Sequence, residues 1–374
     1  MKTVFLILII GRKQMIKVLQ MQRLNIPFRV SFSHAARTRT ATETVFVTTE
    51  LEGGAVGRGE GCPRDYVTGE NLDTAFRFFE KYKERLKAIR SVADLMDFAE
   101  AHRLEIDENP AAFCAIEMSL LDAFGQQGRK SVEELLGVST HMRRFQYSAV
   151  IGITQGFEKM ADEYIALGMK DFKIKLSGHF SEDLKNVGYL QKKVGDGFRL
   201  RVDANNLWCD VDEAVDYIAR LQMPLLGVEE PLKSRNFSDL KEFSKKSKFR
   251  LILDESFKVK DDFDQVVGSD FWIINVRVSK MGGLIRSLRI VEKARKLSVP
   301  IIVGAQVGET SYLSKAGMIV ANSCGASLLA QEGAFGTYLL EKDIVDNPLQ
   351  FGKKGFLKYE SLPDGYGMGL VFRK

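Results

Sequence analysis

The sequence predicts an α/β protein in which an eight-stranded parallel barrel of the (β/α)8, TIM type follows a separate N-terminal α+β domain. From residue 147 onward, short apolar runs recur at intervals of about 25 residues. An amphipathic segment of helical length separates each pair of runs. Eight alternations of a buried strand and a helix favour a parallel barrel. An open doubly wound sheet is the alternative, but it more often has a glycine-rich phosphate loop after its first strand, and VIGITQGFE is a poor one.

The barrel is expected over residues 141–345. Its eight predicted strands are 147–153, 171–177, 198–204, 225–231, 251–256, 272–278, 300–306 and 326–331. The closing segment, 346–374, has strand and turn character without a helical period. We expect it to return to the first domain.

The N-terminal domain is expected over residues 1–140. Alternating Val, Phe and Thr between about residues 15 and 60 run into the turn sequence EGG, as in a β-hairpin. Three helical periods follow, and each begins at Asn, Ser or Pro. A three-stranded sheet followed by a helical bundle is therefore predicted.

Composition describes a folded protein that can bury a large core. Of its 374 residues, 45% are hydrophobic and 28% are charged, and the net charge is +5. Lysine clusters such as 241–248 lack interleaved aromatic residues, so we interpret them as solvated helix faces and expect no nucleic-acid partner. The four cysteines are far apart and have no metal-type spacing. Reduced thiols in a cytoplasmic protein are the economical interpretation.

The first residues, MKTVFLILII, contain an apolar run at the lower limit for a signal-peptide core. GRKQ follows where small cleavage-site residues would stand. The run is also too short to span a bilayer, so no membrane partner is expected. We interpret residues 1–14 as an upstream extension or an extra strand, with a secretory signal as the alternative.

Charged residues end several of the predicted strands, at the edge where barrel enzymes carry their chemistry. They are Lys173 and Lys175 on the second strand, Asp203 on the third, Glu229 on the fourth, Asp254 on the fifth and Lys280 just after the sixth.

Asp203, Glu229 and Asp254 end three consecutive strands, so their side chains are expected to lie close together. Without a partner, their mutual repulsion would raise their pKa values and weaken the fold. A divalent cation resolves this, and oxygen ligands without His or Cys favour Mg²⁺, or Mn²⁺, over Zn²⁺. Each acid alone is equally compatible with a turn or helix-cap role. The three together predict a metal site.

Lys173 and Lys175 point to the same side of their strand, and the mouth of the barrel is the favourable side for two amines. Adjacent ammonium groups lower one another's pKa, so one amine is expected to be partly neutral and able to act as a base. Lys280 lies four strands further round the ring and is therefore expected to face them. Two bases on opposite sides of a metal suit removal and return of a proton next to a carboxylate, through an enediolate.

The motifs KIK, DAN, EEP, DES and SKMGG, in this order and on successive strands, resemble the enolase superfamily. Specifically, they resemble its muconate lactonizing enzyme subgroup in the mandelate racemase/muconate lactonizing enzyme family. That subgroup also holds dipeptide epimerases, N-acylamino acid racemases and o-succinylbenzoate synthases. The resemblance covers nearly the whole chain and implies an N-terminal capping domain, a modified barrel and a tail that rejoins the cap.

The resemblance also implies roles for eight side chains. The residues that resemble the metal ligands are Asp203, Glu229 and Asp254, and those that resemble the acid/base pair are Lys175 and Lys280. Lys173 resembles the residue that tunes Lys175 and contacts the substrate carboxylate. Asn205 resembles a residue close to the metal, and Glu309 resembles the polar residue that ends the seventh strand. A helix cap is the alternative for Glu309.

Departures from the pattern bear on the substrate. Dipeptide epimerases commonly show Asp-x-Asp after the eighth strand, and here Glu332 is the only acid in LAQEGAFGT. An unmodified dipeptide is therefore disfavoured. Loops of the N-terminal domain, within residues 31–40 and near Tyr66, are expected to lie over the mouth of the barrel. Arg37 and Arg39 in the first loop either contact an anionic group of the substrate or lie on the surface. The four histidines offer no replacement for Lys280, which disfavours the His-dependent mandelate racemase type.

The leading functional hypothesis is racemisation or epimerisation of an amino-acid derivative, such as an N-acylamino acid or a dipeptide-like carboxylate. Two alternatives remain: cycloisomerisation of the muconate type, and dehydration of the o-succinylbenzoate synthase type, which is a lyase reaction. Each needs only one chemically active lysine. A noncatalytic binding protein on the same barrel is a further alternative. The expected partners are the small carboxylate substrate and further copies of the chain, as a dimer or octamer.

Overall fold

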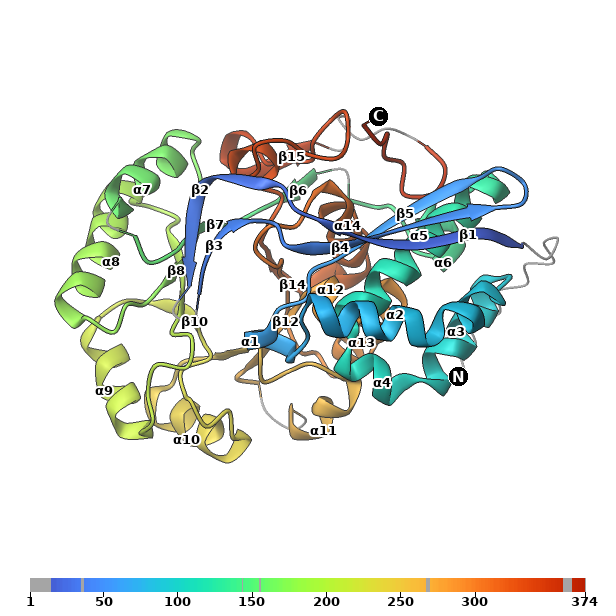
Figure 1. Cartoon of the computed structure of the whole chain (residues 1–374). Helices are drawn as coiled ribbons and strands as arrows, with labels where there is room; N and C mark the ends of the chain where they lie inside the picture. Colours follow the sequence, from blue (N-terminus) through green and yellow to red (C-terminus); the bar gives the residue numbers. More distant parts are fainter. Residues whose placement is uncertain are drawn as a thin grey trace.

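The computed structural model describes residues 15–34, 37–142, 144–154, 156–266, 270–358 and 365–373 (Figure 1). The extension predicted at residues 1–14 lies outside this set. So do the side chains of residues 30–38, among them Arg37. Within the described residues, no helix combines the length and apolar character needed to cross a membrane.

The N-terminal part contains the predicted three-stranded sheet, in the order β1 (Ile16–Leu24), β4 (Thr44–Leu51) and β5 (Val56–Gly61). Helix α5 (Pro110–Gly128) packs on β5, where Gly57, Gly59 and Gly61 alternate along the strand. A Cβ atom at these positions would lie 1.9–2.2 Å from the backbone of α5. Glycine is therefore required for this close approach.

A second hairpin, β2 (Pro27–His34) and β3 (Arg37–Ala41), forms where the sequence indicated only a loop. The remaining helices of this part are α1 (Asp65–Thr68), α2 (Leu72–Lys87), α3 (Val92–Ala101), α4 (Arg103–Glu108) and α6 (Val132–Leu136).

The eight-stranded parallel barrel is confirmed, and each strand lies inside its predicted run. The strands are β7 (Ala149–Ile151), β8 (Asp171–Lys175), β9 (Arg199–Asp203), β10 (Leu225–Glu229), β11 (Leu251–Leu253), β12 (Trp272–Val276), β13 (Ile301–Val303) and β14 (Leu328–Gln331). They lie side by side in chain order. The amide of Ser148, next to β7, donates to the carbonyl of Gln331 at 2.8 Å and so joins the two ends of the sheet.

Helices cover the outside of the barrel. They are α7 (Phe157–Ala166), α8 (Phe180–Val194), α9 (Val211–Arg220), α10 (Phe237–Ser247), α11 (Phe263–Val266), α12 (Val278–Met281), α13 (Leu284–Lys296) and α14 (Ser311–Cys324). Helices α7 to α10 form one side of the molecule, and the sheet β1–β4–β5 with its helices lies on the other (Figure 1).

The C-terminal segment touches the N-terminal part. Strand β15 (Phe356–Lys358) pairs with β6 (Arg144–Gln146), which lies between the N-terminal part and the first barrel strand. Further on, the carbonyl of Gly367 accepts from the amide of Val132 at 2.8 Å, and the ring of Phe372 stacks on Phe46 at 5.8 Å. These contacts agree with a tail that returns to the cap, while the domain limits at residues 140 and 345 stay predictions.

Two buried carboxylates from the N-terminal part reach the first residues of barrel helices. Both oxygens of Glu117 on α5 approach the amides of Leu284 and Ile285, which begin α13. Glu60 on β5 accepts from the amide of Thr310, which caps α14, at 3.1 Å and from its hydroxyl at 2.6 Å. Amides at a helix start have no partner within the helix, so these carboxylates satisfy them across the interface.

Replacing Glu117 with Ala is expected to lower the free energy of unfolding by roughly 2–4 kcal/mol, because each buried amide left without an acceptor costs about 1–3 kcal/mol. Denaturant titration followed by circular dichroism measures this. Glu80→Ala, at an exposed position on α2, is the matched control and should change stability by less than about 0.5 kcal/mol. An equal loss of unfolding free energy in the two variants would show that Glu117 does not stabilise the interface between the N-terminal part and the barrel.

Candidate active site at the mouth of the barrel

The barrel brings the predicted charged residues of its second to fifth strands together. Lys173 and Lys175 lie on β8, Asp203 and Glu229 end β9 and β10, and Asp254 follows β11 directly. Each of the three acids is only 1% exposed. Because neighbouring parallel strands end at the same edge, their side chains converge there.

Lys173 is surrounded by carboxylates. Its Nζ lies 2.7 Å from Glu229 Oε1, 3.1 Å from Glu332 Oε2 and 3.6 Å from Asp203 Oδ2. Burial by itself lowers the pKa of this amine, but the three carboxylates outweigh it and raise the pKa above its usual value. These carboxylates favour the ammonium form of Lys173, and the expectation that one amine of the pair is partly neutral stays a prediction for Lys175.

Lys175 is held by the loop that follows β9. Its Nζ lies 3.0 Å from Asp203 Oδ2 and 2.5 Å from Asn205 Oδ1. The amide side chain and backbone nitrogen of Asn205 both donate to Asp203 Oδ1, at 2.7 and 3.0 Å. Asn205 has a φ of 47°, a left-handed conformation that Asn adopts more readily than most residues. Asn205 thus orients both the predicted base and a predicted metal ligand.

The three acids are paired with cationic side chains. Among the described residues, no group of three or more His, Cys, Asp or Glu side chains has the arrangement of a metal centre. The donor chemistry nevertheless suits a hard cation, because Glu229 Oε2 is buried and has no hydrogen-bond partner within the described part of the chain. Burial also raises the pKa of Glu229, and Lys173 opposes this increase. A cation at this edge would satisfy the unpaired oxygen.

Lys280 lies on α12, which follows β12 at the same edge. Its side chain is 0% exposed, and its Nζ donates to the carbonyls of Asp254 and Asn275 and to Asp254 Oδ1, at 2.7, 2.8 and 2.8 Å. Burial and nearby Arg277 hold its pKa well below the usual value. Lys280 is not among the described residues that line the cavity above the strands. Lys280 therefore contacts Asp254, and neither Asp254 nor Glu229 is among the described residues that line the cavity.

Arg277, which the sequence analysis overlooked, lines that cavity instead. It follows β12 directly, and its guanidinium contacts Asp254, lies 3.8 Å from Glu229 Oε1 and donates to Gln306 Oε1 at 2.9 Å. The sequence could have indicated Arg277 in the same way as the other charged residues, because Arg277 is a charged residue just after the apolar run WIINV.

Glu332 also belongs to the charged cluster. Oε2 accepts from Lys173, and Oε1 lies 3.3 Å from the guanidinium of Arg201 on β9, which is fully buried in the barrel. Burial alone would raise the pKa of Glu332, but these two cations lower it. Arg201 stands two residues before Asp203, so strand alternation was the signal that could have placed it inside. Both oxygens of Glu332 therefore already face protein cations.

Of the three remaining candidates, Glu309, Tyr66 and Arg39, one lines the cavity among the described residues. Glu309 is buried in the turn after β13, accepts from the amide of Gln306 at 2.7 Å and has its pKa raised to about 7 by burial. It lines a separate space of about 10 Å³. Tyr66 lines the main cavity, whereas Arg39 is buried, pairs with Glu43 and lies 5.9 Å from the ring of Tyr66.

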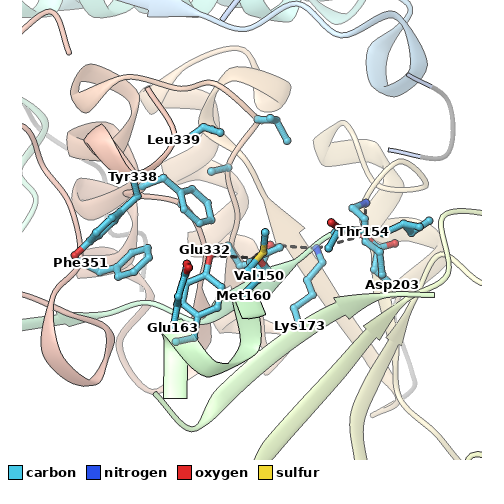
Figure 2. A pocket seen from close by; sticks show the side chains of 18 of the residues that line it. Val150, Thr154, Met160, Glu163, Lys173, Asp203, Glu332, Tyr338, Leu339 and Phe351 are labelled. Atoms are coloured by element: carbon cyan, nitrogen blue, oxygen red, sulfur yellow. Dashed lines mark hydrogen bonds and ion pairs between the residues drawn. The ribbon is translucent and has the colours of Figure 1, made fainter. Parts of the chain in front are cut away.

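The main cavity has a volume of about 510 Å³ and two unlike ends (Figure 2). The polar end holds Lys173, Lys175, Asp203 and Arg277. The other end, here called the apolar arm, is lined by Val150, Met160, Tyr164, Leu167, Phe335, Tyr338, Leu339 and Phe351.

Aromatic rings form one wall of the apolar arm. The ring of Phe351 lies 5.2 Å from that of Tyr338 in a stacked pair and 5.6 Å from that of Phe335 in an edge-on pair. Two charged residues of α7, Lys159 and Glu163, also line the cavity and are exposed. The cavity can therefore accept a molecule with an anionic group at one end and an apolar group at the other.

Comparisons with known proteins agree with this site. A family model described as Enolase C-terminal domain-like matches residues 156–374. The chain is 27% identical over 310 residues to a hydrophobic dipeptide epimerase of Enterococcus faecalis, covering 79% of this chain and 84% of that protein. It is 24% identical over 319 residues to an N-succinyl-L-Arg/Lys racemase of Bacillus cereus, covering 82% and 84%.

A solved structure of the E. faecalis dipeptide epimerase, complexed with Mg and the dipeptide L-Leu-L-Tyr, superposes with a TM-score of 0.81. The identity is 25%, and the match covers 96% of this chain and 99% of that one. These relatives are epimerases and racemases, which are isomerases. Since the family model matches more than half of its length, the chain belongs to the enolase superfamily, in the mandelate racemase and muconate lactonizing enzyme group.

Proposed function

We propose that this protein catalyses Mg²⁺-dependent racemisation or epimerisation of an amino-acid derivative by removing the proton next to a carboxylate. The observation that carries the proposal is the cluster at the strand ends. Lys175 and Asp203 line the cavity 3.0 Å apart, Glu229 ends the next strand and Asp254 follows the strand after it. Relatives that epimerise dipeptides or racemise N-succinyl amino acids support it.

Asp203, Glu229 and Asp254 would hold the ion, with Mn²⁺ as a possible substitute for Mg²⁺. When bound, the ion stabilises negative charge that develops on the substrate carboxylate as the α-proton leaves. Lys175 takes that proton from one face of the carbon, and Asn205 keeps its amine oriented. Lys280, the other member of the predicted acid/base pair, returns a proton to the opposite face. Lys173, fixed as an ammonium group by Glu229 and Glu332, binds the substrate carboxylate by charge.

The two ends of the cavity favour an N-acylated amino acid with a bulky apolar group. The apolar arm removes such a group from water, which contributes about 25 cal/mol per Å² buried. Glu332 cannot readily serve a substrate ammonium group, because Lys173 and Arg201 already occupy it. An acylated nitrogen carries no charge and avoids this conflict.

A one-base reaction is the second candidate, either cycloisomerisation or dehydration. Such a reaction needs one chemically active lysine, and Lys175 lines the cavity. Dehydration lowers the mass of the substrate by one water, which mass spectrometry detects. Cycloisomerisation leaves the mass unchanged but forms a ring, so chromatography against the substrate's two enantiomers distinguishes it from racemisation.

Replacing Lys175 with Ala is expected to reduce α-proton exchange by about 10²-fold or more, because the base on this face is removed. Incubation with N-acylamino acids and Mg²⁺ in D₂O, followed by mass spectrometry, measures the exchange. Lys170→Ala is the control, since Lys170 is exposed just before β8 and outside the cavity. Full exchange by Lys175→Ala would rule out this base.

Removing the divalent ion with EDTA is expected to abolish exchange, and added Mg²⁺ is expected to restore it. Glu229→Gln should weaken Mg²⁺ binding about tenfold or more, measured by titration calorimetry, because one anionic ligand becomes neutral. Glu163→Gln, on the cavity rim, should bind Mg²⁺ as the wild type does. Equal affinities for the Glu229 variant and the wild type would remove Glu229 from the ligand set.

Filling the apolar arm is expected to change selectivity by substrate size. Met160→Trp adds volume inside the arm, so KM for N-acetylphenylalanine should rise about tenfold while KM for N-acetylalanine changes little. Ala166→Trp, at the exposed end of the same helix α7, adds the same ring outside the cavity and should leave both values unchanged. An identical rise for both substrates in Met160→Trp would mean that the arm does not hold the apolar group.

A further inference from the structure

The first strand of the hairpin β2–β3 is bound to the barrel segment that follows β14. The amide of Arg29 donates to the carbonyl of Leu339 at 2.8 Å, and the amide of Glu341 donates to the carbonyl of Pro27 at 3.0 Å. Phe28 belongs to the same buried apolar cluster as Leu339. Because Leu339 lines the apolar arm (Figure 2), one wall of the arm is held by contacts with the N-terminal part.

A buried arginine joins the other end of the hairpin to the turn that follows β13. Arg64 is fully buried, and its Nη2 donates to the carbonyl of Thr42, just after β3, at 3.0 Å and to that of Val307 at 2.6 Å. Its Nη1 donates to the carbonyls of Pro63 and Glu43, at 2.7 and 3.2 Å. Four carbonyls from three stretches of the chain therefore meet at one guanidinium.

The residue type suits this role. All four acceptors of Arg64 are backbone carbonyls. A guanidinium presents five donors in a fixed plane and stays charged in proteins, so it can hold several carbonyls in one geometry. The turn that it holds also lies close to the hairpin, because a Cβ atom at Gly308 would lie 3.1 Å from the Cα of Thr42. Removing the guanidinium would leave buried carbonyls without donors.

The main chain of Arg64 connects the same contact to the cavity. Arg64 immediately precedes the short helix α1, and its carbonyl accepts from the amides of Val67 and Thr68, at 2.9 Å each. Helix α1 carries Tyr66, which lines the cavity, as does Val307. Arg64 thus links two residues of the cavity wall that are more than 200 positions apart in the sequence.

Resting on the function proposed above, we infer that Arg64 is a positioning residue for substrate binding, because it holds the hairpin β2–β3 between two barrel segments that line the cavity. It acts through Val307 and, by way of the hairpin, through Leu339, and Val307 packs against the cluster that contains Leu339. Lys175 and Asp203 lie on β8 and β9, outside these segments. A looser hairpin should therefore weaken substrate binding more than it slows proton removal.

Replacing Arg64 with Met removes the donors and keeps a long, unbranched side chain. KM for N-acetylphenylalanine is expected to rise about tenfold, while kcat changes by less than about twofold. KM for N-acetylalanine should change little, because its small side chain makes few contacts with the arm. Exchange of the α-proton in D₂O at several substrate concentrations, followed by mass spectrometry, gives both constants. Arg64→Lys retains a cation with three donors and should restore most of the lost affinity.

Lys315→Met is the control for lost stability. Lys315 on α14 pairs with Glu133 on α6 at 2.7 Å, and both side chains are largely buried. Its removal leaves a buried carboxylate without a partner, so this variant should also unfold at a lower temperature. Its KM values for both substrates should stay at the wild-type level. If Arg64→Met lowers the unfolding temperature and leaves both KM values unchanged, Arg64 has a structural role alone and the inference is overturned.

Amide hydrogen exchange tests the same contacts without a substrate. Arg64→Met should speed exchange about tenfold in peptides that cover residues 26–29, 304–310 and 337–341, because local opening becomes easier there. Lys315→Met should leave these peptides unchanged. Faster exchange in them supports the role of Arg64 in holding the hairpin even if no carboxylate is turned over, a result that would contradict the proposed function alone. Unchanged exchange in all three peptides overturns the inference.

Discussion

Charge compensation in a dry site is the constraint on which the rest of the active site depends. Three carboxylates that are each 1% exposed converge at the strand ends, and no such group is tolerated in a protein interior without partners. The chain supplies those partners itself. Lys173, Lys175 and Arg277 each contact at least one of the three acids. The cluster is therefore held in place before any substrate arrives.

Compensation also determines which groups remain available for chemistry. Lys173 contacts three carboxylates and is fixed as a cation, while Lys280 is anchored to two backbone carbonyls. Glu332 lies between Lys173 and Arg201 and also lines the cavity. Lys175, which contacts Asp203 and Asn205, lines the cavity as well and is the proposed base.

The N-terminal part takes part in the site by being anchored to the barrel. Glu117 and Glu60 satisfy amides at the starts of two barrel helices, and burial raises the pKa of both carboxyls to about 8. Tyr66 then completes the cavity from the same part of the chain. With the apolar arm formed by segments after β7 and β14, the cavity combines distant stretches of sequence. This arrangement allows the selectivity for the substrate to change through the loops while the charged residues at the strand ends stay the same.

The sequence by itself determined the barrel, its eight strands and the place of Lys173, Lys175, Asp203, Glu229 and Asp254 at one edge. Strand alternation and the common direction of parallel strands make these properties local, so they can be read from spacing. The hairpin β2–β3 was missed because polar residues such as those of RTRTA give little hydrophobic periodicity.

Only the tertiary structure decided which side chains reach the cavity. Arg277 and Lys280 are three residues apart, and spacing alone could not show that the first lines the cavity or that the second donates to the carbonyl of Asp254. The same holds for Glu332, whose partners Lys173 and Arg201 lie more than 130 residues away in the chain. Side-chain direction after a strand end depends on burial and on competing partners from other strands, and these exist only once the barrel has closed.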